Sequence, residues 1–368
     1  MDKPLVTISI PNYNYGHYLN QCLDSVLAQT YPNIEVHFSD NASTDDSFDI
    51  AYSYRKKFRE RGIKMVLKEN KTNVGSYRNS QLSSAGAWGK YIYTLASDDA
   101  IYPEFIERCV SVLEAFPNVG TVIVNRDEIN ERGEIKKLAP FYNESCIIDG
   151  DAQAGVYMLA GIAIPGQRIN SRDVLSKVAA HMRSWNVAGD WYDNFLFACV
   201  SDVAYIKDSL MCYRVHSGNE TNESERKLLG ITEHYQLIHA FLDLANVFDL
   251  KKPQERYGDA VKHLGEMCPR YALRMMRDHQ IDAARRYLKL ALVFNEDMAN
   301  NEDYKSLDAI LKCDDDELIT KKAESFRRQR NLNRTKSYDP PEGYQPLAFK
   351  KVNGELKPYL RTNKNARD

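Results

Sequence analysis

The sequence predicts an α/β fold, with a mostly parallel sheet and flanking helices, followed by an α-helical C-terminal module. Two observations lead to this prediction. Over residues 5–124, short apolar segments alternate with segments whose apolar residues recur at helical spacing, as in parallel strands joined by right-handed crossovers. From about Glu225 onward, helical spacing continues over long stretches without a strand pattern between them.

The first half is expected to contain strands at residues 5–10, 34–38, 63–67, 90–95 and 121–124. The first intervening helix carries Leu19, Leu23 and Leu27 on one face, and the fourth begins near Pro103, where proline favours a helix start. The carboxyl ends of parallel strands share one edge of a sheet. We therefore expect the polar loops that follow these strands to meet at the edge where ligands bind.

Later segments predict the rest of the architecture. Helical periodicity covers residues 228–247, 257–277 and 281–294, whereas residues 337–343 are rich in proline and polar residues, as in a linker. We therefore expect an α/β domain over residues 1–222, a helical domain over residues 223–335 and a basic tail or linker over residues 336–368.

Composition narrows the class of protein. Of 368 residues, 43% are hydrophobic and 27% charged, with a formal net charge of −2, which is a normal globular mixture. No apolar run is long enough to span a bilayer, and the N-terminus has no signal-peptide pattern. The seven cysteines lack metal-type spacing, which favours reduced thiols. We expect a cytoplasmic protein, with the inner face of the membrane as a further location.

The charge is unevenly distributed. Residues 321–368 contain 13 Lys and Arg against 5 Asp and Glu, a local excess of 8 positive charges. This excess favours an anionic partner: a membrane surface with a lipid-linked acceptor, a polyanionic acceptor or a nucleic acid. A solvated, disordered tail would explain the same composition.

An acidic pair, Asp98-Asp99, follows the fourth predicted strand. Two adjacent carboxylates at a strand end suit a hard divalent cation, which in turn neutralises a diphosphate. A solvated turn with acids that cap the next helix is an equally good interpretation of the pair alone.

Two further residues follow neighbouring strands. Asp40 would accept hydrogen bonds from a base or a ribose, or form an Asx turn. Arg78, near the start of a helix, would pair with a carboxylate or phosphate, or be an ordinary surface arginine.

Asp190 is preceded by Gly189 and followed by two aromatic residues, Trp191 and Tyr192. An acid in such surroundings can be desolvated and act as a base, but it can also cap the following helix. His216 lies at the end of the α/β domain, where a histidine is more often a simple polar contact than a ligand.

In their order along the chain, these segments resemble glycosyltransferase family 2, a family of inverting nucleotide-sugar transferases with the GT-A fold. The resemblance extends from residue 5 to about residue 220 and rests on residues 6–14, 19–36, 39–45, 73–79, 97–99, 190 and 213–216. Two departures stand out: Ser97 replaces the first acid of the DxD-type motif, and Gly189 stands where the family usually has a glutamate before the base.

The resemblance implies a role for each candidate. The nucleotide would be held by Pro11, Tyr13, Asp40, Asn73, Arg78 and Asp98. The ligands of a Mn²⁺ or Mg²⁺ ion would be Asp99, Asp98 and His216. Asp190 would be the catalytic base, with Asp193 as the alternative.

The implied activity is transfer of a hexosyl or N-acetylhexosaminyl group from a nucleotide sugar, with a UDP-sugar as the expected donor. The acceptor would be a glycan, lipid-linked or polymeric hydroxyl in surface-polysaccharide or glycoconjugate synthesis. Residues 162–172 would face it or form a structural loop, and aromatic residues such as Trp185 and Trp191 would stack on a sugar or belong to the core. Peripheral membrane contact and a homo-oligomer are further expectations.

Two other functions are alternatives to glycosyl transfer. A nucleotidyltransferase would have a basic, glycine-rich loop after the first strand, but residues 11–16 contain no Lys or Arg. A non-catalytic binding or scaffold protein with the same fold is the other alternative. The presence of candidates for the metal, nucleotide and base sites argues against it.

Overall fold

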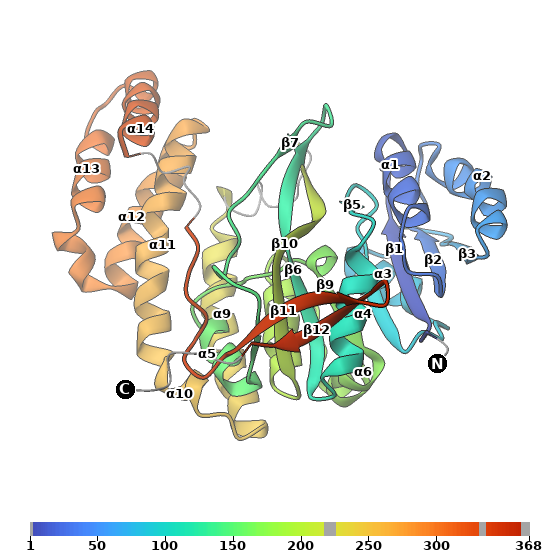
Figure 1. Cartoon of the computed structure of the whole chain (residues 1–368). Helices are drawn as coiled ribbons and strands as arrows, with labels where there is room; N and C mark the ends of the chain where they lie inside the picture. Colours follow the sequence, from blue (N-terminus) through green and yellow to red (C-terminus); the bar gives the residue numbers. More distant parts are fainter. Residues whose placement is uncertain (1–2, 217–225, 331–335, 362–368) are drawn as a thin grey trace.

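The computed structural model describes residues 3–216, 226–330 and 336–361 (Figure 1). Within these residues, twelve strands form one sheet in the order β12-β11-β8-β10-β6-β9-β4-β1-β2-β3, with β5 paired to β10 and β7 to β6. The strands are β1 (Val6–Asn12), β2 (Ile34–Asp40), β3 (Lys64–Glu69), β4 (Tyr91–Thr94), β5 (Ala100–Ile101), β6 (Val119–Asn130), β7 (Ile135–Lys136), β8 (Cys146–Ile148), β9 (Arg168–Ser171), β10 (Asp202–Val215), β11 (Gln345–Val352) and β12 (Glu355–Leu360).

The helices of the α/β half lie along this sheet, and those of the C-terminal half form the helical module. The α/β half contains α1 (Gly16–Leu27), α2 (Ser47–Glu60), α3 (Ser76–Ser84), α4 (Phe105–Ala115), α5 (Gly150–Tyr157), α6 (Arg172–Val178) and α7 (Gly189–Ala198). The module contains α9 (Leu229–Val247), α10 (Lys252–Glu255), α11 (Tyr257–Arg277), α12 (Ile281–Phe294), α13 (Glu302–Leu311) and α14 (Asp316–Arg330).

The mostly parallel α/β sheet with a following helical region is confirmed. Strands β3, β2, β1 and β4 run parallel to one another, and β6 runs parallel to β10. The short strand β9 lies antiparallel between β4 and β6, a strand that the sequence analysis did not predict. Its 4 residues include buried Arg168 and Asn170, so no apolar period marks it as a strand.

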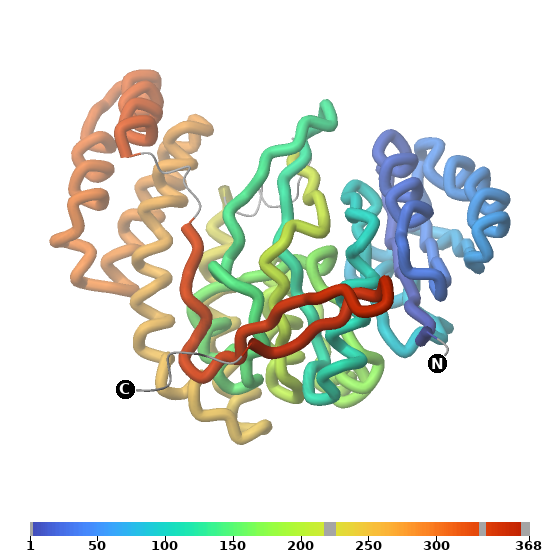
Figure 2. Tube along the Cα trace, in the orientation of Figure 1, coloured from blue at the N-terminus to red at the C-terminus, as the bar shows by residue number. Residues whose placement is uncertain are grey.

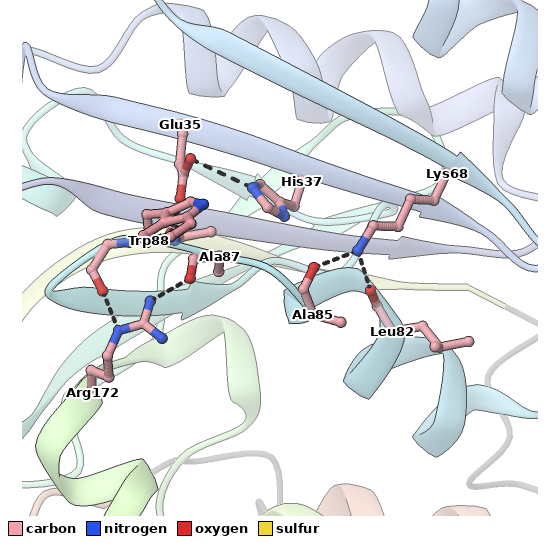
Figure 3. Close-up of polar contacts among 10 residues, drawn as sticks. Glu35, His37, Lys68, Leu82, Ala85, Ala87, Trp88 and Arg172 are labelled. Atoms are coloured by element: carbon pink, nitrogen blue, oxygen red, sulfur yellow. Dashed lines mark hydrogen bonds and ion pairs between the residues drawn. The ribbon is translucent and has the colours of Figure 1, made fainter.

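Charged side chains, of which Glu35 is buried, hold the connection between α3 and β4 against the rest of the α/β half (Figure 3). Glu35 in β2 is 3% exposed and accepts hydrogen bonds from the Thr7 hydroxyl at 2.6 Å and the Trp88 backbone N–H at 2.7 Å. Arg172 and Lys68 donate to main-chain carbonyls, namely those of Gly89 and Ala87 and those of Leu82 and Ala85, respectively. These contacts fix the entry into β4, whose far end leads to the acidic pair.

The helical module shares its core with the sheet. One hydrophobic cluster joins residues of β6 and α7, such as Ile123 and Phe195, with Phe241 of α9 and Met276 of α11. The rings of Phe195 and Phe241 stack with centroids 4.1 Å apart. The module is thus packed directly on the α/β half. None of the described helices is long and apolar enough to cross a membrane.

The prediction of a tail or linker over residues 336–368 is wrong for residues 345–360. They form the antiparallel hairpin β11–β12, which joins the sheet beside β8 and lies across the middle of the molecule (red in Figure 2). Its turn is Asn353-Gly354, both with positive φ, the pair that favours a two-residue hairpin. That signal was present in the sequence, but the surrounding basic residues concealed it.

Candidate active site

The acidic pair lies in the loop between β4 and β5. Asp99 is 2% exposed, and its Oδ1 accepts a hydrogen bond of 2.8 Å from the backbone N–H of Arg214. Asp98 is 8% exposed, and its Oδ2 lies 3.2 Å from Nε2 of His216. Because β10 pairs with β5, its end brings Arg214 and His216 beside this loop. The structure therefore brings two of the three predicted metal ligands, Asp98 and His216, into contact, with Asp99 adjacent in the chain.

Arg214 is a member of this site that the sequence analysis did not single out. Its side chain is buried, and its Nε donates to the carbonyl of Asp98 at 2.7 Å, while the guanidinium lies 4.3 Å from the ring centroid of Tyr18. A buried cation offsets part of the cost of burying the two carboxylates. Burial, followed by the charge of Asp98, still raises the pKa of Asp99 well above its usual range. The available signal was its place within residues 213–216, one of the segments on which the family resemblance rests.

The donor set suits a divalent cation in its chemistry, since carboxylate oxygens and an imidazole nitrogen are ligands that such ions accept. Within the described ranges, however, no group of three His, Cys, Asp or Glu side chains is already spaced to hold a metal ion. One oxygen of Asp99 is engaged by Arg214, whereas Asp98 and His216 contact each other. Asp98 and His216 are therefore better placed than Asp99 to bind a cation, because Asp99 already accepts a hydrogen bond from Arg214.

Asp40, at the end of β2, is held by the protein itself. It is 1% exposed and accepts hydrogen bonds from Nδ2 of Asn12 at 2.9 Å and from the hydroxyl and backbone N–H of Ser43, both at 2.7 Å. A carboxylate has about four lone-pair positions, so at most about one remains for a nucleoside. Nearby, Pro11 is half-buried in β1 and Tyr13 is exposed after it.

The predicted nucleotide contacts near α3 differ in exposure. Arg78 is exposed, and its Nη1 donates to Gln81 at 3.1 Å, while Asn73 is exposed and accepts from Asn41 at 2.8 Å. The neighbouring Asn79 is 2% exposed and bonds both the carbonyl and the hydroxyl of Ser39. Asn79 therefore connects α3 to β2, whereas the adjacent Arg78 on the same helix is exposed to solvent.

Asp190 is the second residue of α7 and lines a cavity of about 280 Å³. Arg126, Trp191, His234 and Met267 also line it, so the cavity lies between β6, α7 and the helical module. Burial raises the pKa of Asp190, and the charge of Arg168 opposes that shift. A carboxylate with a raised pKa beside a cavity is suited to accept a proton.

Asp193, the alternative base, is placed differently. Its Oδ2 lies 3.2 Å from Nη2 of Arg168, which is 4% exposed and also donates to Asn194 at 2.6 Å. Burial raises the pKa of Asp193 to about 6, against the effect of Arg168. Asp193 does not line the cavity at Asp190. Of the two roles expected for residues 162–172, Arg168 has the structural one, because its side chain bonds Asp193 and Asn194 of α7.

Comparison with known proteins identifies the family. The model of glycosyl transferase family 2 matches residues 7–179. Residues 7–179 therefore carry a domain of this family.

Several relatives of this glycosyltransferase support the assignment. An uncharacterized glycosyltransferase of Nostoc sp. is 28% identical over 64% of this chain and 75% of its own. Another from Rickettsia prowazekii is 29% identical over 65% of this chain and 72% of its own. The putative glycosyltransferase EpsH of Bacillus subtilis is 28% identical over 62% of this chain and 66% of its own.

A solved structure supports the fold. The crystal structure of S. aureus TarS 1–349 in complex with UDP-GlcNAc covers 98% of this chain and 97% of its own, with 16% identity and a TM-score of 0.56. The GT-A fold and the assignment as a glycosyltransferase enzyme are thus confirmed. The roles of the individual site residues stay predictions.

In this glycosyltransferase, the helical module also holds the start of α7. Glu233 of α9 is 7% exposed and accepts hydrogen bonds from the backbone N–H groups of Asn186, Val187 and Ala188 at 2.8, 2.6 and 2.9 Å. Ala188 is the N-cap residue of α7, the helix that carries Asp190. The sequence analysis missed Glu233 because its partners are main-chain groups about 45 residues earlier.

Proposed function

We propose that the protein is an inverting glycosyltransferase that transfers a sugar from a UDP-sugar to an acceptor hydroxyl, with Asp190 as the base. The observation that carries the proposal is geometric: Arg126 and Asp190 line the same cavity, and Arg126 donates at 3.0 Å to Gln167, whose neighbour Gly166 packs against Oδ2 of Asp99. The acidic pair and the candidate base therefore lie around one arginine, as a donor site and an acceptor site in contact require.

Support for the donor comes from the family and the fold. TarS, which shares the fold, was crystallised with UDP-GlcNAc and with UDP. In this chain, exposed Tyr13 and Arg78 are the candidates to contact the nucleotide. Asp40 would act mainly by ordering the loop that contains Ser43, through its hydrogen bonds to that residue.

Asp98 and His216, with Asp99 behind them, would hold a Mn²⁺ or Mg²⁺ ion. A divalent cation bound there would stabilise the negative charge of the departing diphosphate. Buried Arg214 keeps the two carboxylates in position through its contacts with both residues.

Asp190 would take the proton of the acceptor hydroxyl as its oxygen attacks C1 of the sugar. The bond between C1 and the β-phosphate oxygen breaks on the opposite face, and UDP leaves with the electron pair. A single displacement of this kind inverts the configuration at C1. The raised pKa of Asp190 increases its strength as a base.

The decisive experiment compares Asp190→Asn with Asp193→Asn. We expect Asp190→Asn to reduce hydrolysis and transfer from the UDP-sugar at least 100-fold, in keeping with the 10²–10⁴-fold of general base catalysis, and to leave UDP binding within twofold of wild type. Asp193→Asn should retain at least a tenth of the activity. If the two variants behave in the reverse way, the base is Asp193.

The cation is tested by calorimetry of UDP binding with and without Mn²⁺. We expect Mn²⁺ to tighten UDP binding in the wild type and to have less effect in Asp98→Asn and Asp99→Asn. Equal UDP affinity with and without Mn²⁺ in the wild type would remove the cation from the proposal.

A further inference from the structure

A second and larger cavity, of about 940 Å³, lies where the helical module meets the α/β half. We call it the arginine cavity, because α11 and α14 line it with Arg270, Arg274, Arg277, Arg327 and Arg330. Arg126 and Lys336 complete its positive charges. Among the described residues, no Asp or Glu lines the cavity.

Contacts with acids neutralise only part of this charge. Glu324 lies 2.8 Å from Arg277 and 2.6 Å from Arg327, and Asp303 lies 2.8 Å from Arg330. Seven cationic side chains line the cavity, and these two carboxylates contact three of them. Arg270 is exposed, and within the described residues no hydrogen bond or ion pair engages it. Such an excess in a concave site attracts anions.

The arginine cavity adjoins the cavity at Asp190. Arg126, Gly161 and Ile162 line both. The Nη1 of Arg126 donates to Gln167 at 3.0 Å, which fixes the guanidinium at the boundary between the two cavities. A ligand held by the arginines would therefore lie next to the cavity that contains the candidate base.

We infer that the arginine cavity binds the acceptor, and that the acceptor is a chain bearing phosphate or carboxylate groups. This inference rests on the proposed function. The planar guanidinium donates paired hydrogen bonds to either anion, and several arginines on two helices suit groups repeated along a chain. The volume of the cavity is that of a site for a few sugar or polyol units, and it is too small for a nucleic-acid duplex.

The test uses three dextrans of equal length: unmodified, phosphorylated and carboxymethylated. Binding is measured by calorimetry with UDP and Mn²⁺ at saturation, so that the donor site is occupied. We expect both anionic dextrans to bind and unmodified dextran to bind at least tenfold more weakly. The affinity should fall as NaCl rises from about 50 to 300 mM, because exposed charges are screened. The tighter of the two anionic dextrans identifies the natural anion.

Variants locate the binding site. Arg270→Glu should weaken binding of the preferred anionic dextran at least tenfold, and Arg270→Lys should weaken it less, because the charge is kept. The matched control is Arg286→Glu on α12, an exposed arginine of the same module outside the cavity, and it should change binding less than twofold.

Three results would overturn the inference: equal binding of unmodified dextran, equal loss in the two Glu variants, or displacement of the anionic dextran by single-stranded DNA at lower concentration than by free dextran phosphate. Failure of the proposed function is a separate result, since it appears as absent UDP binding and absent hydrolysis of UDP-sugars in the wild type.

Discussion

Single acids in the candidate active site differ in the partners that already engage them. Asp98 contacts His216, whereas Asp99 is tied to Arg214 and Asp40 to Ser43. The order of the motifs identified these acids from the sequence. It could not reveal which carboxylate oxygens are already engaged, because the partners come from strands and loops far away in the chain.

The pKa of Asp193 leads to a prediction about pH. Its folded-state pKa of about 6 lies above the usual 3.8, so the folded state binds this proton more tightly than the unfolded state does. This group therefore favours folding at low pH, and its contribution is lost as pH rises from about 4 to 6. For Asp193→Asn, the free energy of unfolding relative to wild type should rise between pH 4.5 and 7, by at most about 3 kcal/mol.

Urea denaturation at several pH values measures this difference. The control is Asp282→Asn, an exposed acid on α12 whose side chain is 88% exposed and for which the difference should stay constant with pH. A constant difference for Asp193→Asn as well would mean that Asp193 is ionised at pH 4.5 in the folded protein.

Among the elements, α7 was predicted from the sequence, but the contacts that hold it were not. The sequence placed Asp190 near the start of a helix, and α7 begins at Gly189. What it could not provide is the capping of that helix by Glu233, since a carboxylate that accepts mainly main-chain hydrogen bonds leaves little pattern in its partners. The same limitation hid β9, whose buried Arg168 holds α7 from the other side.

Glu233→Gln tests the importance of this capping. An amide keeps one acceptor oxygen but loses the charge and places an NH₂ group against N–H donors. We expect the free energy of unfolding to fall by about 1–3 kcal/mol. Transfer should fall several-fold through kcat, with UDP binding unchanged, because α7 shifts while the donor site stays in place.

Thermal melting and steady-state kinetics check both effects. Glu266→Gln on α11 is the matched control: its carboxylate is 56% exposed and contacts only His263 among the described residues. If both variants retain wild-type kcat, Glu233 has no part in placing Asp190.

For the whole molecule, the sequence predicted the α/β half and the helices but not how they are joined. Strand order, the shared core and the hairpin depend on contacts between residues far apart in the chain. Leu347 of β11, for instance, is 2% exposed in the core cluster of the N-terminal strands. The apolar residues of residues 345–360 are few, and basic neighbours made the segment resemble a tail.

The hairpin provides a paired test of this architecture, because Leu347 and Leu360 are cross-strand partners with different exposure. Leu347 is buried, whereas Leu360 is 38% exposed. We expect Leu347→Ala to destabilise the whole protein by about 2–5 kcal/mol and Leu360→Ala by less than about 1 kcal/mol. Calorimetric melting measures both. If both variants melted at the same temperature as the wild type, the hairpin would add nothing to the stability of the sheet.

The contact between Glu233 and the start of α7 constrains how such enzymes can be recombined. A chimaera that exchanges residues 226–330 for the helical module of a relative replaces the residue that holds the helix of the candidate base. It should keep catalytic geometry only where the incoming module supplies a carboxylate at the position of Glu233. Modular exchange in this fold therefore depends on one glutamate, even where the surrounding apolar surfaces match.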